Sequence, residues 1–196
     1  MSTSPEWALP ARRLPGDLAM WFFILAEITV FSLLILAFAI TQRLQPALFA
    51  AGRQALDASM GLALTLSLLS AGWLLAMAVG RVRQGRGGAA ALLLAALLSA
   101  CVYVWLKLGE YGHLLSLGLD VEHDTFFTLY WLLTGFHFLH VLLGMAIIAF
   151  MAVGAWRGRY RQGDCSGLES GALYWHMVDL VWVLLFPLVY LIGAGP

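Results

Sequence analysis

The sequence predicts an all-α protein, a polytopic membrane helix bundle of five transmembrane helices that forms a single domain over residues 1–196. Of these residues 62% are hydrophobic and 11% are charged, whereas a soluble domain has about 25% charged residues. Five apolar runs each approach or exceed the length of about 20 residues that a helix needs to cross the hydrocarbon layer. This composition excludes a soluble enzyme, a disordered chain and a nucleic-acid-binding protein.

The expected spans cover residues 18–41, 58–80, 88–106, 125–155 and 172–193. The first contains one carboxylate, Glu27, and the second contains no charged residue. The fourth is longer than a perpendicular span, so we expect it to tilt or to project from the bilayer. Pro187 lies in the fifth, where its missing N–H predicts a kink. Between the first two spans, residues 42–57 fit either a short interfacial helix or a plain loop.

Basic residues divide unevenly between the two ends of these spans. Eight arginines fall on the N-terminal side and three basic residues fall on the other: Arg12, Arg13, Arg81, Arg83, Arg86, Arg157, Arg159 and Arg161 against Arg43, Arg53 and Lys107. Because cytoplasmic loops are rich in Arg and Lys, the N-terminus is predicted to be cytoplasmic and the C-terminus periplasmic. Glu110 is assigned to an external acidic stretch, which leaves Glu27 and Asp179 as the acids well inside the spans.

Glu27 is the first candidate functional residue. A carboxylate at membrane depth costs about 2.5–3.5 kcal/mol on insertion scales, so such residues usually have a role. Burial favours the protonated form, which can hydrogen-bond another helix. Two interpretations remain open, a neutral structural glutamate at a helix interface and a proton-handling group.

Two further pairs of polar residues lie three positions apart, so the members of each pair share a helix face. His137 and His140 in the fourth span are possible metal or haem ligands, although no thiolate or carboxylate completes a ligand set; otherwise they donate hydrogen bonds. His176 and Asp179 in the fifth span can bond each other. The topology predicts that Glu27, His176 and Asp179 lie in the cytoplasmic half, with both histidines of the fourth span nearer mid-depth.

These residues leave two other functions open. One is a stand-alone haem- or metal-binding membrane enzyme that uses His137 and His140. The other is a small proton-coupled transporter built around Glu27, although no inverted repeat supports it.

Motifs in family order along nearly the whole chain resemble subunit III of the haem-copper oxidases. They are MWFFILAE at 20–27, Lys107 with Glu110 and Tyr111, Phe126 and Phe127, TGFHFLHV at 134–141 with Gly144, and YWHMVDLVW at 174–182. The usual subunit III has seven helices, so five indicate a short branch. The ending at 185–192 is similar to NorE-type proteins associated with nitric oxide reductase.

The resemblance implies an accessory subunit of an oxidoreductase complex in the bacterial inner membrane, either a cytochrome c oxidase or a nitric oxide reductase. It implies no haem, copper or other metal in this chain. Haem, with copper or non-haem iron, would belong to the catalytic partner, which works with a cytochrome or other electron-donor subunit. Glu27, His137, His140, His176 and Asp179 would form a polar network for lipid or proton access. Six arginines would meet phospholipid headgroups or partner subunits: Arg81, Arg83, Arg86, Arg157, Arg159 and Arg161.

Overall fold

The computed structural model describes residues 18–160 and 165–192, and all regular structure in these residues is helical. The elements are α1 (Leu18–Leu44), α2 (Pro46–Gln54), α3 (Ala58–Arg83), α4 (Ala89–Ser116), α5 (Thr125–Trp156), α6 (Ser166–Phe186) and the short π-helix η1 (Pro187–Leu191). Within these two ranges, five helices are long and apolar enough to cross a membrane, namely α1, α3, α4, α5 and α6 with η1. The predicted fold class is confirmed.

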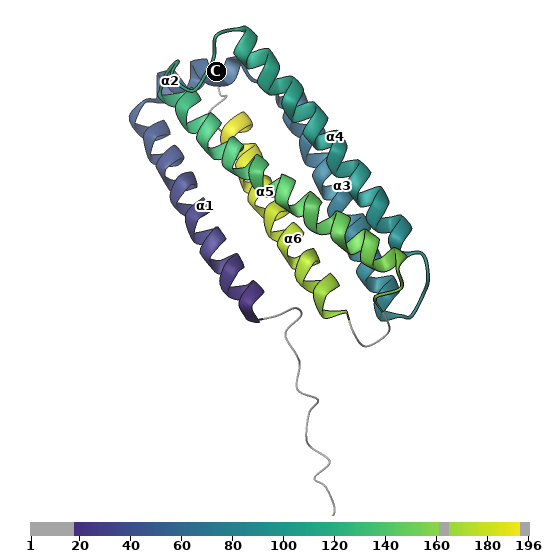
Figure 1. Ribbon diagram of the computed structural model, residues 1–196. Helices are drawn as coiled ribbons and strands as arrows, with labels where there is room; N and C mark the ends of the chain where they lie inside the picture. The colour runs from purple at the N-terminus through teal and green to yellow at the C-terminus, as the bar shows by residue number, and fades with distance from the viewer. Residues whose placement is uncertain (1–17, 161–164, 193–196) are drawn as a thin grey trace, which may run out of the picture.

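Four helices, α3 to α6, form a bundle in which each packs on two of the others, and α1 packs against α5 and α6. Figure 1 shows α1 along one side of this bundle and α2 across one end. Successive long helices run in opposite directions, so the molecule has two distinct ends. We call one the arginine end, after the exposed Arg81, Arg83, Arg86, Arg157 and Arg159, and the other the α2 end.

Helix α1 is attached along a narrow stripe. Its buried residues are Ile24, Phe31 and Phe38, spaced by seven residues, which places them on one face of a helix. Most of its other large side chains, such as Phe22 and Leu33, are exposed. Partly buried residues beside the stripe, among them Ile28 and Ile35, also pack against the core.

Residues 42–57 contain a helix rather than a plain loop. Pro46 begins α2, a position where proline's missing N–H is harmless. Phe49 is fully buried, with its ring centroid 5.0 Å from Phe38 and 5.3 Å from Phe126. At Gly52 an added Cβ would lie 2.6 Å from Cγ of Phe126, so only glycine allows this close approach. These contacts fix the short helix α2 against α1 and α5.

Two aspartates at the α2 end cap the helices that begin there. The side chain of Asp57 accepts a 2.8 Å hydrogen bond from the Ser59 amide, and that of Asp124 accepts a 2.9 Å bond from the Phe127 amide. Such caps satisfy N–H groups that have no partner within the helix. The bonds from Ser59 also lower the pKa of Asp57.

Two spans are longer than predicted. Helix α4 continues to Ser116, ten residues past the expected limit near 106, and α6 begins at Ser166 rather than near 172. Lys107 and Glu110, expected after the end of the third span, lie within α4 at 0% and 7% exposure. The helix is longer than expected because the expected limit was set at the first charged residue, whereas these two charges are paired inside the protein.

Candidate functional site

Glu27 and His140 form a direct contact between α1 and α5. Glu27 Oε2 lies 2.9 Å from His140 Nε2, and both side chains are mostly buried. The other ring nitrogen, Nδ1, lies 2.8 Å from the Phe136 carbonyl oxygen. A carbonyl only accepts hydrogen bonds, so Nδ1 carries a proton. A hydrogen bond between Nε2 and the carboxyl then requires one more proton, held by either group. The pair is therefore built to share one proton.

His137 lies one turn away but in a different environment. It is fully buried, and neither ring nitrogen has a hydrogen-bond partner within residues 18–160 and 165–192. Its ring packs on Trp182, with 5.0 Å between centroids, and edge-on to Tyr103. Since both nitrogens of His140 are already engaged, the two histidines are not arranged as a ligand pair. No cluster of three or more metal-binding side chains occurs among the described residues.

His176 and Asp179 form the other predicted pair, on α6. His176 Nδ1 lies 3.9 Å from Asp179 Oδ2, with the imidazole 45% exposed and the carboxylate 9% exposed. The carboxylate points at α3, where a Cβ on Gly72 would lie 3.4 Å from its Cγ. The other carboxylate oxygen, Oδ1, is buried without a hydrogen-bond partner among the described residues. The five predicted residues thus divide into two pairs and an isolated histidine.

A third polar cluster, which the sequence analysis did not identify as a site, surrounds Lys107 near the α2 end. The Lys107 ammonium donates to Glu110 Oε2 at 2.7 Å and to the hydroxyls of Tyr130 and Tyr190, both at 3.2 Å. Tyr190 in turn donates to Glu110 Oε1 at 2.7 Å. Each ammonium proton and each carboxylate oxygen therefore has a partner. The cluster joins α4, α5 and η1.

Aromatic rings enclose the same ammonium. Nζ of Lys107 lies 4.8 Å from the ring centroid of Tyr111, 5.1 Å from that of Tyr130, 5.4 Å from that of Trp182 and 5.8 Å from that of Tyr190. Ring faces attract a cation, most strongly where water is excluded. The signal in the sequence was the spacing of Lys107 and Glu110, which puts the two on one helix face. The enclosing rings come from distant segments and gave no local signal.

Arg53 of α2 completes the α2 end. Its side chain is 6% exposed and donates from Nε to the Val189 carbonyl and from Nη2 to the Leu188 carbonyl, both at 3.1 Å. These carbonyls belong to η1, the last turn of the fifth span, where no further helical N–H can reach them. Burial lowers the pKa of Arg53, but a guanidinium remains protonated in proteins. Arg53 therefore anchors η1, which follows α6 directly, to α2.

Replacing Arg53 with Met should loosen η1. Each buried carbonyl left without a donor costs about 1–3 kcal/mol, so amide exchange in residues 187–192 should speed up. Hydrogen–deuterium exchange with mass spectrometry measures this directly. Arg43→Met is the matched control, because Arg43 is exposed and should leave exchange unchanged. Equal exchange in both variants would show that Arg53 does not hold η1.

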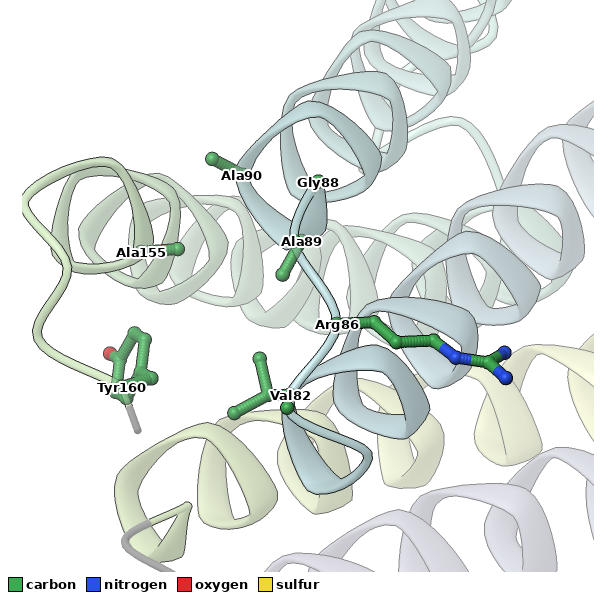
Figure 2. A pocket seen from close by; sticks show the side chains of 9 residues that line it. Val82, Arg86, Gly88, Ala89, Ala90, Ala155 and Tyr160 are labelled. Atoms are coloured by element: carbon green, nitrogen blue, oxygen red, sulfur yellow. The ribbon is translucent and has the colours of Figure 1, made fainter. Parts of the chain in front are cut away.

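The predicted basic face appears at the arginine end. Arg81, Arg83, Arg86, Arg157 and Arg159 are exposed there, while Arg161, Arg12 and Arg13 lie outside the described residues. A pocket of about 430 Å³ lies between the α3–α4 turn and the end of α5. Figure 2 shows Tyr160 and Val82 at this pocket and the Arg86 side chain extending away from it. Its walls are mostly glycine and alanine, and the guanidinium groups remain on the surface.

The α2 end has far less free positive charge. Arg43 is exposed, whereas Arg53 and Lys107 are buried in the contacts described above. Among the described residues, five exposed basic residues at the arginine end therefore face one at the α2 end, a higher ratio than the eight to three of the sequence count.

Known proteins resemble this chain over most of its length. A family model described as cytochrome c oxidase subunit III matches residues 16–194. Cytochrome c oxidase subunit 3 of Lumbricus terrestris is 31% identical over 100 residues, which cover 51% of this chain and 39% of the relative. The heme-copper oxidase subunit I+III of Aeropyrum pernix is 30% identical over 196 residues, covering 95% of this chain and 24% of the relative.

A relative of similar length is quinol oxidase subunit 3 of Bacillus spizizenii, 27% identical over 179 residues that cover 91% of this chain and 87% of the relative. By contrast, the chain spans well under half of the Lumbricus and Aeropyrum proteins. The match to the family model includes all five membrane-spanning helices.

Proposed function

The chain belongs to the cytochrome c oxidase subunit III family, and on that premise we propose that it is a non-catalytic accessory subunit of a haem-copper respiratory complex. In this proposal the haem, with copper or non-haem iron, resides in a catalytic partner that receives electrons from a further subunit. The observation that carries the proposal is the Aeropyrum relative, named for subunits I and III in one chain, which aligns with 95% of this chain. Two segments of one protein are expected to work side by side.

The parent complex is proposed to be a bacterial terminal oxidase or a nitric oxide reductase, as the similarity of residues 185–192 to NorE-type proteins suggests. We place the complex in the cytoplasmic membrane, with the arginine end of this chain facing the cytoplasm. The exposed arginines of that end support this orientation, since positive residues are retained in the cytoplasm. They are proposed to contact anionic phospholipid headgroups and partner subunits.

Glu27, His137, His140, His176 and Asp179 are proposed to serve lipid or proton access rather than redox chemistry. The hydrogen bond between Glu27 and His140 supports a proton-related role, because either group can hold the proton between them. The pair lies at the edge of the bundle, where α1 meets α5. Packing against the catalytic subunit would use the apolar faces that the bundle leaves exposed, such as that of α1.

This function is tested by deleting the gene for this chain and examining the membranes of the deletion strain. Membranes lacking it should contain less of the haem-copper complex, or a complex that loses activity during turnover, and expression of the wild-type chain should restore both. Haem spectra and oxidant consumption measure the two quantities. Unchanged yield and unchanged turnover without the chain would refute the accessory role.

Glu27→Gln should show whether the Glu27–His140 contact holds α1 in place without the carboxyl proton. A glutamine amide can still donate to Nε2, so α1 should remain packed, but the variant cannot hold the shared proton. Infrared spectra should lose the carboxyl band of Glu27, while amide exchange at residues 18–44 should stay as slow as in the wild type.

Glu27→Leu is the companion variant, because it removes both the proton and the hydrogen bond. It should loosen α1 as well, seen as faster amide exchange at residues 18–44. Thr29→Ala is the control, since the Thr29 hydroxyl donates within α1, to the Leu25 carbonyl. If amide exchange at residues 18–44 is as fast in Glu27→Gln as in Glu27→Leu, the hydrogen bond to His140 does not hold α1 in place.

A further inference from the structure

His176 presents a polar ring on the outer surface of a membrane-spanning helix. Its side chain is 45% exposed, and it lies ten residues after Ser166, about 15 Å along the helix axis. The paired Asp179 oxygen at 3.9 Å is beyond hydrogen-bonding distance. A polar group at this depth has no water to bond and is costly unless another molecule supplies a partner. The position of His176 therefore indicates a ligand.

A groove leads to this imidazole between α3 and α6. It has a volume of about 280 Å³ and is open along its side. Its floor is apolar, formed by the small residues Ala76, Gly80 and Ala172 together with Val79 and Leu173. Its two ends differ, because the ion pair of Arg83 and Glu169, 2.9 Å apart, closes the end nearer the arginine end, while His176 closes the deeper one. The groove is thus apolar along its length and polar at its ends.

The charges favour a ligand without net charge. Arg83 and Glu169 neutralise each other, and no other Lys, Arg, Asp or Glu lines the groove among the described residues. The depth favours the same conclusion. His176 is seven residues beyond Glu169, about 10 Å further into the membrane, whereas phosphate groups remain in the interfacial layer. A phospholipid phosphate at the rim would not reach the imidazole.

We propose that this groove binds the headgroup of an isoprenoid quinone or its quinol, with His176 bonded to a ring oxygen. Imidazole suits both redox forms, because its N–H donates to a quinone carbonyl and its unprotonated nitrogen accepts from a quinol hydroxyl. Asp179 Oδ2 lies on the Nδ1 side of the ring, 3.9 Å away. The small residues of the floor leave room for a flat ring, and the open side lets the isoprenoid tail pass into the lipid. This inference extends beyond the accessory role and does not depend on it.

The test uses the full chain in nanodiscs of phosphatidylcholine and a photoreactive azidoquinone. Crosslinks mapped by mass spectrometry should fall on α3 and α6 around the groove, and decylubiquinone should compete with them. His176→Phe keeps a ring but loses the hydrogen bond, and should weaken labelling by about tenfold, as expected for one lost bond in an apolar site. Ala172→Phe, which fills the groove, should abolish labelling. His176→Gln, which can still donate and accept, should retain most of it.

Leu98→Phe is the control, because it introduces the same phenyl ring at a site 61% exposed on α4, and it should label like the wild type. Circular dichroism of each variant establishes that it is folded. Labelling spread over all helices, or unchanged in His176→Phe, would overturn the proposal. So would competition by phosphatidylglycerol and not by decylubiquinone, which would assign the groove to an anionic lipid.

Discussion

Lys107→Met should be among the most destabilising single substitutions in this protein. It leaves the Glu110 carboxylate at 7% exposure without its cation, and removing one partner of a buried ion pair costs about 3–5 kcal/mol. The hydroxyls of Tyr130 and Tyr190 lose a donor at the same time. The free energy of unfolding in mixed micelles, followed by circular dichroism, measures the effect.

The double variant Lys107→Met with Glu110→Leu provides the control. Removing both charges takes away the unpaired carboxylate, so the double variant should be more stable than Lys107→Met alone. A single variant as stable as the wild type would mean that the cluster around Lys107 contributes no stability. A double variant less stable than the single one would mean that the unpaired charge is not the cause.

Gly144→Val should separate α5 from α6. A Cβ at this position would lie 2.8 Å from Cε3 and 3.0 Å from Cζ3 of Trp175, a side chain with no exposed surface. The indole has nowhere to move, so the helices themselves must shift. Overpacking of this kind costs about 1–3 kcal/mol and sometimes more. The same unfolding assay measures it.

Gly135→Val is the matched control on the same helix. No atom outside its own helix lies within 4 Å of the Cβ that this change adds, so stability should change little. If both valine variants have the same free energy of unfolding, the close approach of Gly144 to Trp175 does not affect stability.

Much of the fold can be predicted from the sequence, because a bilayer imposes a simple length and polarity requirement on each span. This requirement does not predict where each helix ends. A run of apolar residues stops at Lys107, yet α4 continues for nine more residues, because Glu110 neutralises the ammonium and aromatic rings cover it. Charge pairing inside the protein is a tertiary effect, which a count of apolar residues does not include.

The candidate site was harder to predict than the fold. A helical spacing of three shows that His137 and His140 are near neighbours, but not that Glu27, 113 residues away, bonds His140. Neither does it show that His137 lies against Trp182. Glu27 could be recognised as significant from its cost in a membrane. Its partner depends on how α1 packs against α5, which the spacing does not determine.

The accessory role is tested most directly by affinity purification of the tagged chain in mild detergent, with mass spectrometry of the chains that accompany it and a visible spectrum. We expect a haem-copper catalytic subunit in about equal amount, with the haem lost when that subunit is separated from the tagged chain. Absence of any such subunit, or stoichiometric haem or metal in the isolated chain, would contradict the account.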